Sequence, residues 1–298
     1  MKNIIVVTGG AGFVGSNLIE KLIKYSTKKI ISIDDYSSGS KKNHIKSKRI
    51  TYIKGSTQNI FKILSKKTKY IETFFHFGEY SRIYQSFKNF NKCFQSNIGG
   101  TKEVILFCLK NNIKLIYSAT SASLGKKGKD ENLSPYAFTK SKNLELLENL
   151  KNWFKFKFEI IYFYNVYGPR QIEDGENATV IGIFHKQYKN KIPLTIVKPG
   201  TQRRRFTHIN DTIKICFKAW KLDKCKHYAI SNKKSYSIIE VAKMFRSKTR
   251  YLPSRKGERF ASKLTKMNLS NKVDINFGET KLKNYINELI TQKSIKNI

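Results

Sequence analysis

A tyrosine and a lysine stand one helical turn apart in the segment SPYAFTKSK. Tyr136 and Lys140 are four residues apart, which places both side chains on one face of a helix. A tyrosine hydroxyl titrates near pH ~10 in water, and a neighbouring ammonium group favours its ionised form. A phenolate in that position can take the proton of an alcohol while the carbon is oxidised. The pair therefore predicts acid–base chemistry at a hydroxyl-bearing carbon.

Three glycines form a second constellation, in the segment VVTGGAGFVGSNL. Gly9, Gly12 and Gly15 follow an apolar segment directly and precede a helical pattern directly. Glycines allow a tight turn and a close approach to a pyrophosphate, and the N-terminus of the helix that follows offers free amide groups there. The loop predicts a site for a dinucleotide.

The second apolar segment, KIISIDD, ends in an acid at Asp34. A carboxylate at this point accepts a hydrogen bond from a ribose 2′-hydroxyl and repels a 2′-phosphate. The sequence therefore favours NAD over NADP, although Lys41 and Lys42 lie nearby and soften that exclusion.

Apolar segments alternate with helical patterns along the first half of the chain. This alternation predicts an α/β fold, a Rossmann-type doubly wound parallel sheet. A mixed pattern after YGPRQ indicates a smaller C-terminal substrate-binding lobe. We therefore expect an NAD-binding domain at 1–165 and a region at 166–298 that mainly forms this lobe. Part of the second region can return to the NAD-binding domain. The expected strands are 3–8, 29–35, 50–55, 71–78, 113–120 and 158–166, and the expected helices are 16–25, 87–111, 134–150 and 178–188.

The composition is strongly basic, with a formal charge of +37. The basic residues comprise 48 lysines and 10 arginines, and the lysines are scattered along the whole chain. Arginine is the residue that reads bases and grips phosphates, so this balance indicates solvated lysines rather than a specific nucleic-acid site. The four dispersed cysteines form no metal-ligand pattern with the histidines, and no apolar run is long enough to span a membrane. We expect reduced thiols, no metal and a cytoplasmic protein.

Taken together, the motifs resemble those of the extended short-chain dehydrogenases/reductases, in their nucleotide-sugar epimerase and dehydratase branch, closest to members like UDP-glucose 4-epimerase. The resemblance covers nearly the whole chain. The motifs that carry it are TGGAGFVGSNL, DDYSSG, FFHFGEYSR, NIGGT, YSATSASLG, the Tyr136–Lys140 pair, YFYNVYGPRQ, GTQRRRFTHIND and SRKGERF.

The resemblance implies roles for individual residues. Thr120 would complete a catalytic set with Tyr136 and Lys140, which would also touch the cofactor. Asn165, Arg204 and Arg255 would bind the substrate. The residues implied for the cofactor are Gly9, Gly12, Phe13, Val14, Gly15, Asp34, Ser56, Phe77, Gly78, Asn97, Tyr136 and Lys140.

The sequence departs from the family pattern at several positions. Ser56 replaces the acid that usually caps the adenine amine, and Arg205 replaces the acid of an Arg-Asp-aromatic motif, where we expect a solvated extra charge. Dehydratases of the branch follow their threonine with Asp-Glu, and decarboxylases have a glutamate at the position of Ala122. Here Ser121 and Ala122 follow Thr120, so both acids are missing.

Without those acids, the resemblance implies an NAD-dependent nucleotide-sugar 4-epimerase, with transient oxidation at C4 to a 4-keto sugar and re-reduction on the other face, on a UDP-sugar. A 4,6-dehydratase or a 4-reductase remains open as an alternative enzyme. A catalytically silent NAD-binding or nucleic-acid-binding protein remains open as a non-enzyme. Relatives pair through the helices expected at 87–111 and 134–152, so a homodimer is expected.

Overall fold

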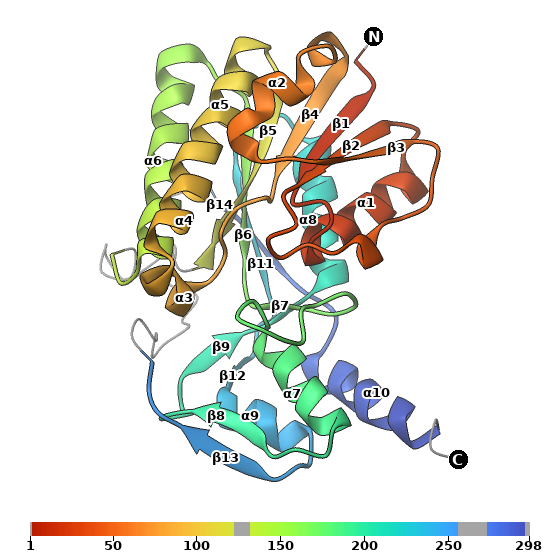
Figure 1. Ribbon diagram of the computed structural model, residues 1–298, viewed down its shortest axis with the longest axis vertical. Helices are drawn as coiled ribbons and strands as arrows, with labels where there is room; N and C mark the ends of the chain where they lie inside the picture. Colours follow the sequence, from red (N-terminus) through yellow and green to blue (C-terminus); the bar gives the residue numbers. More distant parts are fainter. Residues whose placement is uncertain (1, 122–131, 256–272, 296–298) are drawn as a thin grey trace.

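The computed structural model describes residues 2–121, 132–255 and 273–295. Its centre is a parallel sheet of eight strands in the order β14-β11-β6-β5-β4-β1-β2-β3 (Figure 1). The six inner strands are buried, nearly continuous apolar segments, typical of strands covered on both faces, and the two edge strands are partly exposed. The strands are β1 (Ile4–Thr8), β2 (Lys29–Asp34), β3 (Ile50–Lys54), β4 (Ile71–His76), β5 (Lys114–Thr120), β6 (Phe158–Phe163), β11 (His227–Ser231) and β14 (Val273–Phe277).

Helices cover both faces of the sheet, as the alternating pattern predicts. On one face lie α1 (Phe13–Tyr25) and α8 (Ile209–Lys221), whose apolar side chains pack with Ile5 and Val7 of β1. On the other face, α2 (Ile60–Leu64), α5 (Thr101–Lys110) and α6 (Pro135–Phe154) pack with Val6 (Figure 1). Successive residues of β1 thus serve opposite cores, and the doubly wound fold is confirmed.

The chain crosses back into the sheet after residue 166, because β11 pairs with β6 and β14 pairs with β11. The remaining C-terminal elements form a second lobe below the carboxyl ends of the strands, with its own apolar core (Figure 1). This lobe comprises β7 (Val166–Tyr167), α7 (Val180–Lys189), β8 (Leu194–Val197), β9 (Arg203–Arg205), β10 (Thr207–His208), β12 (Ser235–Ser237), α9 (Ile238–Met244), β13 (Thr249–Leu252) and α10 (Leu282–Ile295).

The helix expected at 87–111 is interrupted. The structure has α3 (Ile83–Lys88), α4 (Phe90–Phe94), a wider π-helical turn η4 (Gln95–Gly100) and then α5. Asn89 leaves the helical conformation, with φ −107° and ψ 45°. Gly100 packs tightly on Thr57 of the short turn η2 (Thr57–Asn59), where a Cβ would lie 2.1 Å from the threonine hydroxyl oxygen. The turn also places Asn97 beneath the segment that follows β4.

All four cysteine side chains are free thiols, as the sequence predicts. Within the described ranges, no helix is long and apolar enough to cross a membrane.

Candidate active site

The glycine loop joins β1 to α1, and Gly9 and Gly12 in it are partly accessible. Gly9 has φ +68°, and a Cβ at Gly15 would lie 2.2 Å from the carbonyl oxygen of Gly9. Gly12 precedes the first helical residue, Phe13, and no side chain caps the helix there. The first amide groups of a helix have no partner inside the helix, so they are available to an anion. The loop fits the pyrophosphate of a dinucleotide.

Asp34 ends β2 beside this loop and is largely buried. One carboxylate oxygen accepts from the amide of Ala11 at 2.9 Å, and the other accepts from the amide of Tyr36 at 2.8 Å. Burial raises the pKa of Asp34, and these two amides oppose that rise. Each carboxylate oxygen has a second lone pair, so Asp34 can hold the loop and also accept a ribose hydroxyl.

The end of β4 lies directly against the glycine loop. The hydroxyl of Thr8 accepts from the amides of Phe77 at 3.2 Å and Gly78 at 3.1 Å. A Cβ at Gly78 would come within 2.8 Å of the Gly9 amide nitrogen, so only a glycine fits this approach. The cofactor loop and the β4 terminus therefore form one unit.

Tyr136 lies in the first turn of α6, where Ser134 caps the helix by accepting from the Ala137 amide at 3.1 Å. The side chain of Thr120, the last residue of β5, forms a hydrogen bond with the phenol of Tyr136. Burial raises the pKa of Tyr136 to about 12, and the bond from Thr120 opposes this rise. The structure thus brings together two of the three expected catalytic groups, and the third lies one turn further along α6.

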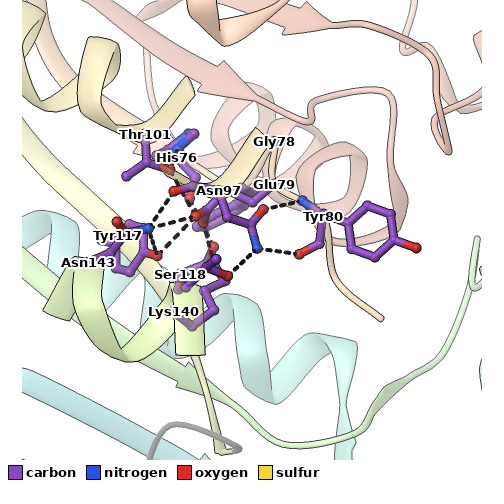
Figure 2. Close-up of polar contacts among 12 residues, drawn as sticks. His76, Gly78, Glu79, Tyr80, Asn97, Thr101, Tyr117, Ser118, Lys140 and Asn143 are labelled. Atoms are coloured by element: carbon purple, nitrogen blue, oxygen red, sulfur yellow. Dashed lines mark hydrogen bonds and ion pairs between the residues drawn. The ribbon is translucent and has the colours of Figure 1, made fainter. Parts of the chain in front are cut away.

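That third group, Lys140, is buried and forms an ion pair with Glu79, the third residue after β4 (Figure 2). Its ammonium also donates to the Ser118 carbonyl at 2.5 Å and lies 4.7 Å from the centre of the Tyr117 ring. Burial lowers the pKa of Lys140, and Glu79 opposes that fall.

This ion pair alters the electrostatic surroundings that the sequence predicts for Tyr136. We expected the ammonium of Lys140 to favour the Tyr136 phenolate, but the Glu79 carboxylate balances that charge and raises the pKa of Tyr136. The cation that lowers the Tyr136 pKa is Arg82. Sequence reasoning missed Glu79 and Arg82. The available signal was a pair of opposite charges in EYSR, directly after a buried strand.

The structure shows structural contacts for two further residues expected at the cofactor. Asn97 is fully buried; its side-chain oxygen accepts from the Tyr80 amide at 2.7 Å, and its nitrogen donates to the Tyr80 carbonyl at 3.0 Å (Figure 2). Ser56 caps η2 by accepting from the Gln58 amide at 3.2 Å. Direct contacts of Asn97 and Ser56 with a cofactor stay predictions.

The three residues expected to bind substrate lie beyond β6, where the chain leaves the central sheet for the second lobe. Asn165, with φ 38°, donates to the Arg205 carbonyl at 2.9 Å, and Arg204 lies in β9. Arg255 lies over the ring of Tyr84 in α3, 5.4 Å from its centre. Through this contact, the segment after β13 in the second lobe touches α3 of the first lobe.

Arg205 differs from its expected role. Its guanidinium is half-buried and donates to the carbonyls of Asn232 at 2.9 Å and Lys233 at 2.6 Å, so it ties β9 to the turn before β12. It is not a solvated extra charge. Ala122 lies outside the described residues.

A phosphate-binding loop at the switch between β1 and α1, and a phenol with a hydroxyl partner at the end of β5, suit one chemistry. That chemistry is the dinucleotide-dependent oxidation of an alcohol, which places the protein among the Rossmann-fold oxidoreductase-like enzymes. The chain belongs to the NAD dependent epimerase/dehydratase family, whose model matches residues 5–231. It is an NAD-dependent enzyme of the nucleotide-sugar epimerases.

Individual relatives support the assignment. The chain is 33% identical over 228 residues, 70% of each chain, to the uncharacterized UDP-glucose epimerase YtcB of Bacillus subtilis. It resembles the UDP-N-acetylglucosamine 4-epimerase of Methanobrevibacter ruminantium, at 26% identity and a TM-score of 0.84, over 99% of this chain and 100% of that one. It also resembles the UDP-glucuronic acid 4-epimerase of Bacillus cereus, solved with UDP-glucuronic acid and NAD, at 26% identity and a TM-score of 0.82, over 97% and 99%.

Proposed function

We propose that the protein is a nucleotide-sugar 4-epimerase that acts on a UDP-sugar. The observation that carries the proposal is the hydrogen bond between Thr120 and the buried Tyr136, at the carboxyl edge of the sheet that also bears the glycine loop. Ser121 follows Thr120, where dehydratases of the branch carry an acid. The two proteins of known structure named above are a UDP-N-acetylglucosamine 4-epimerase and a UDP-glucuronic acid 4-epimerase.

The proposed roles follow from the positions of the side chains. The glycine loop and Asp34 would hold NAD, which would supply reversible hydride acceptance when bound. Tyr136 takes the proton of the C4 hydroxyl and later returns it, while Thr120 hydrogen-bonds the reacting oxygen. Asn165, Arg204 and Arg255 hold the diphosphate end, so the sugar can turn over between two faces of the site.

Because the diphosphate contacts come from the second lobe and the phenol comes from the first, the two functions are separable by mutation. Tyr136→Phe should lower turnover about 100- to 10,000-fold, the usual contribution of a positioned acid–base group. Nucleotide-sugar binding, measured by calorimetry, should persist in this variant. Tyr25→Phe, at an exposed position of α1, is the matched control and should leave turnover unchanged.

The reaction itself is tested with UDP-sugars labelled with deuterium at C4, with products resolved by NMR. A 4-epimerase returns the label to C4 of an inverted sugar without loss of water. Label at C6 of a 4-keto-6-deoxy sugar would instead identify a dehydratase, and consumption of added NADH would identify a 4-reductase. No product from UDP-, dTDP-, GDP- and CDP-sugars, with NAD still bound, would favour a silent NAD-binding protein.

We further propose a cytoplasmic homodimer. The helices that would pair expose large apolar side chains, among them Phe90 of α4, Leu106 of α5 and Trp153 of α6. Phe90 and Phe94 stack with ring centres 4.4 Å apart, and Phe94 stacks on Phe138 of α6 at 6.1 Å. Exposed apolar side chains gathered on neighbouring helices in this way are suited to burial against a second copy of the chain.

A further inference from the structure

Glu79 gathers donors from three elements around one buried carboxylate. One of its oxygens accepts from the hydroxyls of Thr101 at 2.9 Å and Tyr117 at 3.0 Å, and from the Asn143 amide at 3.4 Å (Figure 2). The other accepts from Lys140. Its side chain is 2% exposed. Every partner donates to a carboxylate oxygen, so both oxygens of Glu79 act as acceptors in this arrangement.

A directed chain of hydrogen bonds continues behind the carboxylate. Since Thr101 donates its single hydroxyl proton to Glu79, it must accept from Nε2 of His76, at 2.9 Å. Nδ1 of His76 then accepts from the Thr8 hydroxyl at 2.8 Å. Burial lowers the pKa of His76 to about 4, so its ring is neutral. This series of hydrogen bonds links Glu79 to Thr8 at the end of β1, the strand that leads into the glycine loop.

The electrostatic surroundings of Tyr136 make Glu79 influential. Several charged or titratable side chains act on the phenol or on the Glu79–Lys140 pair. They are Glu79 and Arg82 after β4, His76 of β4, Cys93 of α4, Tyr117 of β5 and Lys140 of α6. Of the groups that act on the Tyr136 pKa, Glu79 is the one carboxylate in the described part of the chain, and it raises that pKa.

We propose that Glu79 is a positioning residue, which holds Lys140 in place and sets the pH range over which Tyr136 takes up and returns its proton. The inference rests on the function proposed above. Glu79 does so by two effects of the same sign. Its negative charge disfavours the phenolate, and it also stabilises the ammonium of Lys140. Loss of the charge should therefore move both ionisations to lower pH.

The first test is the pH profile of kcat/KM for Glu79→Gln, which keeps the shape of the side chain and removes its charge. We expect both the acid limb and the alkaline limb to move down by about one pH unit, the order of shift that a close charge produces. Glu79→Asp retains the charge and should keep the limbs near their wild-type positions. Glu72→Gln is the matched control, because Glu72 is an ion-paired carboxylate at the other end of β4.

A purely structural role for Glu79 would lower kcat without moving either limb, and that result would overturn the proposal. Limbs that move to higher pH would also overturn it. The profile of Glu72→Gln should coincide with that of the wild type.

A second test needs no substrate and remains informative if the reaction is a different one. Tyrosinate absorbance is titrated in the holoprotein, and the signal of Tyr136 is isolated by subtracting the same background carrying Tyr136→Phe. Glu79→Gln should ionise Tyr136 at lower pH than the wild type. The double variant Glu79→Gln/Lys140→Met removes both charges and any folding problem caused by a lone ammonium. Tyr136 should again ionise at lower pH than in the wild type, because the carboxylate that raises its pKa is absent. A single or double variant whose titration is unmoved, or displaced to higher pH, would refute the effect of Glu79 on the phenol.

The two tests separate the two hypotheses. The expected titrations without any epimerase activity would refute the proposed reaction and leave the role of Glu79 intact. Epimerase activity with unmoved titrations would do the reverse.

Discussion

Replacing Lys140 by methionine should lower the stability of the protein strongly, because it leaves the Glu79 carboxylate buried without its cation. The side chains of this ion pair are 4% and 2% exposed. Removal of one partner of such a pair typically costs about 3–5 kcal/mol, since the remaining charge has lost both water and its counterion. The Lys140→Met variant should therefore unfold at a clearly lower urea concentration than the wild type, as followed by circular dichroism.

The double variant Lys140→Met/Glu79→Gln should recover most of that loss. Neither side chain is then charged, and replacing both partners of a buried pair is often nearly neutral. The resulting cycle should show a coupling energy of about 3 kcal/mol between positions 79 and 140. Lys28→Met is the matched control, because the Lys28–Glu72 pair is 29% and 31% exposed and should contribute at most about 1 kcal/mol.

Two results would refute this reasoning. Lys140→Met could prove no less stable than Lys28→Met, which would mean that water reaches the Glu79 carboxylate. Alternatively, the double variant could be destabilised by the sum of the two single effects, which would mean that the charges do not interact.

Three further outcomes are expected. Denaturing the purified protein should release NAD, assayed enzymatically, because Asp34 disfavours the 2′-phosphate; recovery mainly of NADP would contradict this role. Gly15→Ala should abolish NAD binding in calorimetry, because its Cβ would lie 2.2 Å from the Gly9 carbonyl oxygen, whereas at Gly99 the nearest atom to an added Cβ is 3.4 Å away, so Gly99→Ala should bind normally. Leu106→Glu should convert a dimer to a monomer in sedimentation at micromolar concentration; a wild-type protein that is already monomeric would refute the dimer.

Much of the fold was predictable because it depends on local pattern. The strands of the first half are short apolar segments, and the glycine loop lies where a strand meets a helix. The strands β11 and β14 were harder to predict, because they enter the sheet from a region whose pattern is mixed. The break at Asn89 was also hidden, since the residues on both sides favour helix and the tight contact of Gly100 with Thr57 depends on tertiary packing.

At the site, spacing along one helix predicted that Tyr136 and Lys140 lie one turn apart on α6, and the motif on β5 pointed to Thr120, which the structure places beside Tyr136. The partner of Lys140 could not be found in this way, because Glu79 is 61 residues away in the chain. Which acid meets which base across a sheet depends on the order of strands and on side-chain direction, which sequence pattern alone does not specify. Arg205 was misjudged for the same reason, since the carbonyls that it binds belong to a distant turn.

The cluster around Glu79 also carries a consequence for the way this protein can evolve. Thr101 and Tyr117 each direct a hydroxyl proton at one carboxylate, and each would be left with a buried unsatisfied donor if an apolar residue replaced Glu79. The Asn143 amide would keep its hydrogen bonds to the Asn97 carbonyl and the Tyr117 hydroxyl. A single apolar substitution at position 79 is therefore costly while both hydroxyls remain. An alignment of relatives should show positions 79, 101 and 117 changing together, and relatives with alanine at position 79 beside an intact threonine and tyrosine should be rare.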